Sequence, residues 1–374
     1  MRRSRLEKLI FGVMCTVLVI AVVGVTTLAA PSFSMVQAAT FISAALVAPK
    51  QAFETVTFLW DVKEEQTEVV PAAQTVDEND LSSGWWTEMP TKEAEPVNPS
   101  EEIPEGMGLL NEVQYPTIGE GQLYVACGAA SIKNVTEVSN EEVTQEIANP
   151  PDFAVELNSS EPQVLIMHTH ATESYESVEH SWYDPANTGR NTDTSQNVVA
   201  VGAEMVSVLN AAGINTIQDA TLHDYPSYNG SYERSKATVE SYLQKYPSIK
   251  VVLDVHRDAI EKEGTRIKPI CSIGDMKSAQ VMIICGADNG KMNMPNYMKN
   301  LRFAAVWQNA MESAYPGLTR PVLFDYRNYN QQLTTGSLLI EVGGHANTLE
   351  EAKYAARMAA QGLVTCLTQY AAQK

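Results

Sequence analysis

The chain has 374 residues and a formal net charge of −19, from 45 acidic and 26 basic residues. The length suits roughly two or three average domains, and the lack of a basic patch argues against a nucleic-acid-binding protein. The five cysteines are scattered without CxxC spacing, which argues against a disulfide framework or a cysteine-based zinc finger.

The N-terminus predicts a membrane anchor. Met1–Lys8 is basic, and Leu9–Ala30 contains no charged residue. As a helix, this run would span about 33 Å, enough to cross a bilayer core of about 30 Å. We therefore expect a cytoplasmic tail (1–8), a transmembrane anchor (9–30) and an extracytoplasmic remainder, which places the protein at the cell membrane. A cleaved signal peptide is the alternative, but the apolar run is long for one.

Residues 31–161 predict an acidic linker. Between Asp61 and Glu161, 22 acidic residues face 3 basic ones. Such a segment repels itself and has few residues for a core, so we expect mostly disordered spacer. Two less polar islands interrupt it. Ser82–Trp86 is either a docking motif or a local contact, and Leu123–Lys133 is either a short strand pair or a segment that packs on the following domain.

Residues 162–374 have the pattern of an α/β domain. Apolar runs of strand length alternate with helical patterns, which predicts a mainly parallel sheet with helices on both faces. The expected strands are Gln163–Met167, Ile214–Gln218, Ile249–Val255, Ala279–Gly286 and Ser337–Val342. The expected helices are Asn197–Ala212, Ser231–Lys245, Met298–Ala314 and Leu349–Tyr370.

Polar residues terminate three of these apolar strands. The run QVLIMHTHATESY brings His168, His170 and Glu173 to a strand end. His256 ends KVVLDVHRD, and Glu341 ends the apolar part of SLLIEVGGHAN. Ligands and chemistry in open α/β sheets lie outside the carboxyl ends of the strands. The three strand ends are therefore candidates for one site.

The residue types suit a hydrolytic zinc centre. His170 and Glu173 have HxxE spacing, and His256 would complete a set of three protein ligands for Zn²⁺. The open position holds a water whose pKa the metal lowers. Glu341 then suits the role of general acid/base. His168 competes with His170 as the first ligand, although HxxE spacing favours His170.

Each of these residues also has a structural explanation. HxxE spacing occurs often by chance. His256 and the two residues after it could form a structural ion-pair cluster. Glu341 could be a buried acid whose carboxylate is bonded by backbone N–H groups. Three polar strand ends together favour a metal site, because an isolated buried charge is costly. The remaining histidines are expected at the surface or the rim of the site; they are His180, His223 and His345.

The motifs HTHATESY, LDVHRDA and LLIEVGGHAN resemble the stage II sporulation protein P (SpoIIP) family of spore-forming Gram-positive bacteria. The resemblance covers roughly Pro162 to the C-terminus. That family is similar to zinc-dependent N-acetylmuramoyl-L-alanine amidases, with a sheet flanked by helices. The resemblance implies peptidoglycan amidase and endopeptidase activity, Glu341 as the catalytic acid/base, and action at the sporulation septum during engulfment. It also implies the membrane partners SpoIID and SpoIIM.

The sequence departs from the simpler amidases in one respect. Their glutamate ligand usually opens the helix after the first strand, where this chain has Asp193, Thr194 and Ser195. Glu173 is therefore supported by its spacing, and Asp193 is the alternative ligand.

Two other functions compete with the amidase. A zinc carboxypeptidase would need a cationic clamp for the terminal carboxylate, for which Arg257, Arg266 and Arg327 are available. A non-catalytic septal tether that binds peptidoglycan is the alternative from another class.

Overall fold

The structure, a computed structural model, describes residues 95–96 and 101–372. The predicted cytoplasmic tail, the anchor at 9–30 and the Ser82–Trp86 island lie outside these residues. Within the described part, no helix is both long and apolar enough to span a membrane.

A mixed sheet forms the centre of the domain. Its strand order in the described chain is β3, β4, β13, β12, β14, β8, β5, β7. Most neighbours run parallel; β12 is antiparallel to β14, and β3 to β4. The expected mainly parallel α/β fold is confirmed. The bounds are Tyr124–Cys127 (β3), Ala130–Asn134 (β4), Val164–Met167 (β5), Thr216–Gln218 (β7), Val251–Asp258 (β8), Val281–Gly286 (β12), Val322–Asp325 (β13) and Gly336–Gly344 (β14).

Helices cover both faces of this sheet. On one face, α5, α7 and α8 pack on the strands and on each other, and α4 packs against α7 and β3. On the other face, α6 and the short helix η2 cover β5 and β8. The bounds are Asn140–Ile147 (α4), Val198–Ala211 (α5), Ser231–Lys245 (α6), Tyr297–Ala314 (α7), Gln331–Leu333 (η2) and Leu349–Gln369 (α8).

Strand alternation decides which residues reach the α6 face. In β8, Val251, Leu253 and Val255 belong to the large core cluster under α5, α7 and α8. Successive side chains of a strand point to opposite faces, so Asp254 and His256 lie on the α6 face. The same alternation in β14 assigns Glu341 to that face, and the register places it opposite His256.

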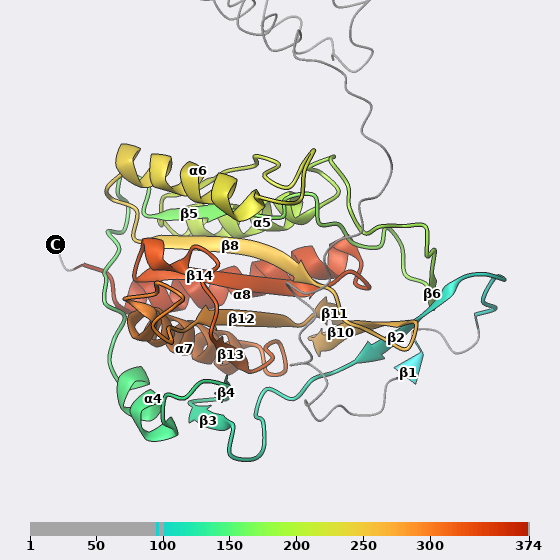
Figure 1. The fold of residues 1–374 in the computed structure, drawn as a ribbon, viewed down its shortest axis with the longest axis horizontal. Coiled ribbons are helices and arrows are strands. Elements are labelled where there is room, and N and C mark those ends of the chain that lie inside the picture. Colours follow the sequence, from blue (N-terminus) through green and yellow to red (C-terminus); the bar gives the residue numbers. More distant parts are fainter. Residues whose placement is uncertain (1–94, 97–100, 373–374) are drawn as a thin grey trace, which may run out of the picture. The chain divides into compact units, whose positions relative to one another are not determined.

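A second, smaller sheet lies beyond the carboxyl ends of β8 and β14 (Figure 1). Its order is β1, β2, β10, β11, with β6 on β2 and β9 on β10. Strand β2 pairs parallel with β10, although more than 150 residues separate them in the sequence. The bounds are Glu95–Pro96 (β1), Gly108–Val113 (β2), Trp182–Tyr183 (β6), Glu261–Lys262 (β9), Thr265–Ile273 (β10) and Met276–Ala279 (β11).

The predicted disordered linker at 31–161 is wrong for residues 101–161. The Leu123–Lys133 island forms most of the β3–β4 hairpin, and β4 joins the main sheet beside β13. Acidic residues of this segment, which we expected to repel one another, pair with basic residues that are distant in the sequence. Glu112 lies 3.4 Å from the Lys268 ammonium, and Glu101 lies 2.8 Å from His180. Pairing of this kind depends on the fold and is invisible in a local charge count.

A β-bulge follows Glu341 directly. The β14–β8 register shifts between Glu341 and Gly344. Gly343 has a φ of +67°, and a Cβ there would lie 2.7 Å from Asn347 Oδ1 and 2.8 Å from Ala279 Cβ. Only glycine combines that conformation with this space, so the first glycine of the GG in LLIEVGGHAN is required at the bulge.

We expect Gly343→Ala to lower the free energy of unfolding by roughly 2–5 kcal/mol, since a left-handed conformation and overpacking both contribute. Gly264→Ala is the matched control. Gly264 has a φ of +77° with nothing within 4 Å of its Cβ position. That variant should lose only about 1–2 kcal/mol. Equal losses in urea melts of the two variants would contradict the packing argument.

Candidate active site

The residues predicted from the three strand ends come together. Glu173 Oε2 lies 3.4 Å from His256 Nδ1, and the His170 and His256 ring centroids are 5.3 Å apart. Glu341 is the cross-strand neighbour of His256. All four are buried, with 5 % exposure or less. The sheet register, with parallel strands ending at one edge, produces this juxtaposition.

His170 presents one ring nitrogen without a partner. Its Nδ1 faces Ser231 Oγ at 3.5 Å and Asp224 Oδ2 at 4.0 Å. Its Nε2 is buried and has no hydrogen-bond partner. The ring stacks on Tyr228 at 4.5 Å. Burial lowers the pKa of His170 to about 3, so the ring is neutral. With its proton on Nδ1, His170 has a free lone pair on Nε2.

His256 lies between two carboxylates. Besides Glu173, it meets Asp254, whose Oδ1 is 2.8 Å from His256 Nε2. The direction of that approach is not that of a hydrogen bond, so the contact is ionic. Burial opposes charge on this ring, but Asp254 and then Glu173 outweigh it and raise the pKa of His256 well above its ordinary value. The metal-free site therefore holds an imidazolium between two acids.

Asp254 is a residue that sequence reasoning missed. Its carboxylate accepts hydrogen bonds from the Thr169 backbone N–H at 2.8 Å and from the Thr169 hydroxyl at 2.6 Å. The available signal was its position two residues before His256 in a strand, which puts both side chains on one face.

Glu173 is held as a carboxylate. Burial alone would raise its pKa, but the hydrogen bond from His256 and the charge of Arg257 hold it well below the usual range. The Arg257 backbone N–H donates to Glu173 Oε2 at 3.2 Å. The Arg257 side chain bonds the carbonyl oxygens of Ser174 and Gly189, which ties the loop after β5 to β8.

Glu341 is held in the opposite state. Its Oε2 is buried without a hydrogen-bond partner. Burial, reinforced by the negative charge of Asp258, raises the pKa of Glu341 to about 8. Two acids in one site thus have pKa values pushed apart, which is the arrangement that general acid/base chemistry uses.

His168 has no nitrogen to offer a metal. Its Nδ1 lies 2.9 Å from the Val255 carbonyl oxygen, and its Nε2 lies 2.9 Å from Gln218 Nε2. This supports His170 rather than His168 as the candidate ligand. Asp193 is exposed, and its carboxylate accepts bonds from the Ser195 backbone and hydroxyl, so it is unlike the buried cluster.

The three remaining histidines are only partly where we expected them. His180 is partly exposed and stacks on Trp182. The predicted rim position is wrong for His223, which is 2 % exposed and bonded to the His168 carbonyl oxygen. His345 is also buried, at 7 % exposure. It lies just after the bulge, and its backbone N–H donates to the Asp258 carbonyl oxygen, which holds it against the end of β8.

The donor set suits Zn²⁺ in its chemistry. Two imidazoles and a carboxylate are ligands that zinc prefers. The unpartnered Nε2 of His170 is a buried lone pair of the kind that a cation would satisfy. As the side chains stand, however, no group of three or more His, Cys, Asp or Glu within the described residues is arranged to hold a metal ion. Small side-chain rotations, of His256 above all, would be needed to direct the three donors to one point.

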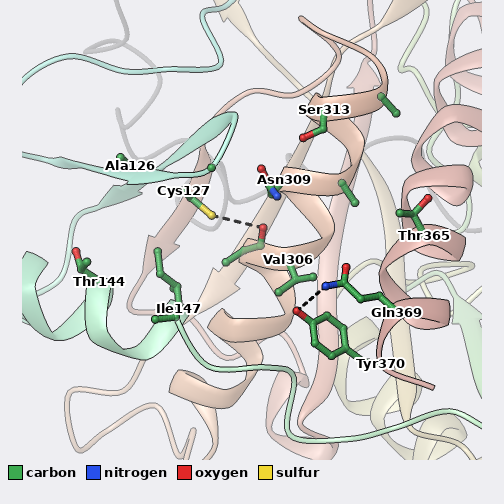
Figure 2. A pocket seen from close by; sticks show the side chains of 15 residues that line it. Ala126, Cys127, Thr144, Ile147, Val306, Asn309, Ser313, Thr365, Gln369 and Tyr370 are labelled. Atoms are coloured by element: carbon green, nitrogen blue, oxygen red, sulfur yellow. Dashed lines mark hydrogen bonds between the residues drawn. The ribbon is translucent and has the colours of Figure 1, made fainter. Parts of the chain in front are cut away.

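A separate groove lies elsewhere on the domain. It has a volume of about 620 Å³ and is bounded by α4, the β3–β4 turn, α7 and the end of α8 (Figure 2). Its lining side chains carry no carboxylate, imidazole or cationic group. Burial raises the pKa of Cys127, the thiol in its wall, to about 11, which disfavours the nucleophilic thiolate form. The groove offers no hydrolytic chemistry.

Comparison with known proteins gives one family. The family model for stage II sporulation protein P matches residues 112–364. The stage II sporulation protein P of Bacillus subtilis (strain 168) is 30% identical over 240 residues, which are 61% of this chain. The chain spans only 56% of that relative's length.

Solved structures of amidases have distant similarity. N-acetylmuramoyl-L-alanine amidase AmiC2 of Nostoc punctiforme has 11% identity and a TM-score of 0.33, covering 57% of this chain and 98% of its own. The CwlD amidase of Clostridioides difficile, solved in complex with the GerS lipoprotein, has 10% identity and a TM-score of 0.34, covering 56% and 98%.

The raised pKa of Glu341 predicts a pH-dependent stability difference. Between its unfolded value of about 4.5 and its folded value of about 8, the folded chain retains a proton that the unfolded chain has released. The contribution of Glu341 to the stability of the metal-free wild type therefore falls as pH rises through this window. In Glu341→Gln, which has no such proton, the melting temperature should exceed that of the wild type by an amount that grows from pH 4.5 to 8. A constant difference across these pH values, in the presence of chelator, would contradict the assignment.

Proposed function

The chain belongs to the stage II sporulation protein P (SpoIIP) family, and on that premise we propose that it is a peptidoglycan hydrolase of sporulating cells. Its reaction is that of an N-acetylmuramoyl-L-alanine amidase, which cleaves the amide between muramic acid and the first residue of the stem peptide. Endopeptidase activity on peptide cross-links is part of the same proposal.

One observation carries this proposal. Within the segment that the family model matches, three strand ends bring two imidazoles and two carboxylates into one buried cluster. The cluster contains His170, Glu173, His256 and Glu341. One acid is kept ionised and the other is kept protonated near neutral pH. A structural ion-pair network does not require one ionised and one protonated acid. Amide hydrolysis does use a group that can first accept a proton and then donate it.

His170, Glu173 and His256 would hold a zinc ion. When bound, zinc lowers the pKa of water and polarises a carbonyl group. Its positive charge also favours the ionised form of Glu341, which needs to be a carboxylate to accept a proton. Asp254 holds His256 from the side opposite Glu173.

Glu341 transfers the proton during hydrolysis. It accepts a proton from the attacking water, whose oxygen bonds to the amide carbon. It then delivers that proton to the amide nitrogen as the carbon–nitrogen bond breaks, so the products are a carboxylic acid and a free amine. The bulge after Glu341 sets the direction in which β14 leaves the site.

Location and partners are part of the proposal. The apolar run at Leu9–Ala30 would make this a single-pass protein of the cell membrane, with its N-terminus in the cytoplasm and residues 31–374 outside. Family membership supports the sporulation septum as its place of action, with SpoIID- and SpoIIM-type membrane proteins as partners.

The alternatives have less support. Arg257 bonds backbone carbonyl oxygens, Arg266 lies 3.7 Å above the Tyr183 ring, and Arg327 bonds Asp325 at 2.9 Å. The three arginines expected to clamp a carboxypeptidase substrate are thus engaged in internal contacts. The non-catalytic tether gives no reason for the buried acid pair Glu173 and Glu341.

We expect the full-length protein, purified in detergent, to bind about one zinc per chain and to release stem peptides from peptidoglycan. His170→Ala and His256→Ala should lose the metal. Glu341→Gln should keep it but hydrolyse the amide at least about a hundredfold more slowly, as expected for loss of a general base. A Glu341→Gln protein with wild-type activity would leave the tether as the better explanation.

The neighbouring histidine provides a matched control. Because both nitrogens of His168 are bonded within the fold, His168→Gln should lower the melting temperature but keep the zinc content of the folded protein. Loss of zinc from folded His168→Gln, with retention in His170→Ala, would reverse the ligand assignment.

A further inference from the structure

The hydroxyl of Tyr232 is buried and has no hydrogen-bond partner within the described residues. Buried tyrosines usually bond their hydroxyl, because an unpaired buried donor lowers stability. The buried Tyr175 obeys that rule, and the half-buried Tyr354 also bonds its hydroxyl. Tyr175 donates to the Val342 carbonyl oxygen at 3.0 Å, and Tyr354 donates to the Ile273 carbonyl oxygen at 3.2 Å. An unsatisfied group such as Tyr232 therefore calls for an explanation.

Tyr232 lies at the site described above. It is the second residue of α6, and its ring meets the His170 ring edge-on, with centroids 5.5 Å apart and an interplanar angle of 84°. On its other side it stacks on Tyr329 at 5.3 Å. Its carbonyl oxygen accepts a bond from Asn330 Nδ2 at 2.9 Å. These contacts fix the ring, so the hydroxyl is held in place before any substrate arrives.

The surroundings keep the hydroxyl protonated. Burial, reinforced by the negative charge of Asp254, raises the pKa of Tyr232 well above its ordinary value. A tyrosine hydroxyl is protonated near neutral pH, so this unpartnered group can donate a hydrogen bond. It shares the site with two other unpartnered buried atoms, His170 Nε2 and Glu341 Oε2.

We propose that Tyr232 is a catalytic residue whose hydroxyl donates a hydrogen bond to the carbonyl oxygen of the scissile amide. This inference rests on the proposed amidase function. As the water oxygen bonds to the carbonyl carbon, the carbonyl oxygen gains negative charge and the Tyr232 hydroxyl stabilises it. The carbon–nitrogen bond then breaks, the nitrogen leaves with a proton from Glu341, and Tyr232 keeps its own proton throughout.

A donor placed in this way acts mainly on the transition state. The charge on the carbonyl oxygen is small in the bound substrate and large after water attack, so the hydrogen bond strengthens as the reaction proceeds. A fixed donor in a buried site needs no reorganisation at that moment. The expected signature is a lower kcat with an almost unchanged KM.

The test compares Tyr232→Phe with the wild type, both full-length, in detergent and loaded with zinc, on purified peptidoglycan fragments. We expect kcat to fall about 100-fold, as for removal of one oxyanion donor, with KM and zinc content unchanged. Without metal and substrate, the melting temperature should stay the same or rise, because the variant removes an unpaired hydroxyl. Tyr354→Phe is the control: it should lower the melting temperature and leave kcat unchanged.

The results of these assays distinguish a failure of the role proposed for Tyr232 from a failure of the proposed amidase function. Wild-type kcat in Tyr232→Phe, with Glu341→Gln inactive, would overturn the role of Tyr232 and leave the amidase intact. A fall in kcat accompanied by a lower melting temperature or lost zinc would make Tyr232 structural and also overturn the proposal. If the wild type itself cleaves no amide, the proposed function fails, and the role of Tyr232 fails with it.

Discussion

The structure depends on the compensation of buried charge at the carboxyl ends of β5, β8 and β14. Ionised groups are costly to bury unless they are paired. His256 provides this pairing, because its positively charged ring lies between the carboxylates of Glu173 and Asp254. The Thr169 hydroxyl donates to the other oxygen of Asp254, and the Arg257 backbone N–H is a second donor to Glu173 Oε2. A divalent cation bound here would replace the proton on His256 as the source of positive charge, and so metal binding and protonation compete at this site.

The same constraint explains why the domain begins well before Pro162. Lys268 on β10 is 1 % exposed and would be untenable alone. Its ammonium lies 2.7 Å from Glu351 at the start of α8 and 3.4 Å from Glu112 on β2. The early acidic segment thus supplies charge that the later basic residues need. The smaller sheet combines β2 of the early acidic segment with β9, β10 and β11, which follow β8, and it flanks the edge where the candidate catalytic residues gather.

Several polar atoms of the site nonetheless have no partner. The Nε2 of His170, the hydroxyl of Tyr232 and the Oε2 of Glu341 are all buried and unbonded. Each such group lowers stability by about 1–3 kcal/mol. Packing elsewhere offsets this loss, since the core under α5, α7 and α8 is continuous from β4 to β5. Functional sites commonly retain such unsatisfied groups, because they become satisfied only with a ligand in place.

The amino-acid sequence by itself determined the α/β class, the positions of the central strands and the candidate set His170, Glu173, His256 and Glu341, which the fold brings together. These follow from local rules: apolar runs mark buried strands, and polar residues at strand ends mark sites. Only the tertiary structure decided the rest. The contacts of Asp254 with His256 and of Tyr232 with His170, and the bonding of both His168 nitrogens within the fold, depend on which side chains meet across β5, β8 and α6. The start of the domain depends on pairing between β2 and β10, and such long-range partners leave no local pattern in the chain.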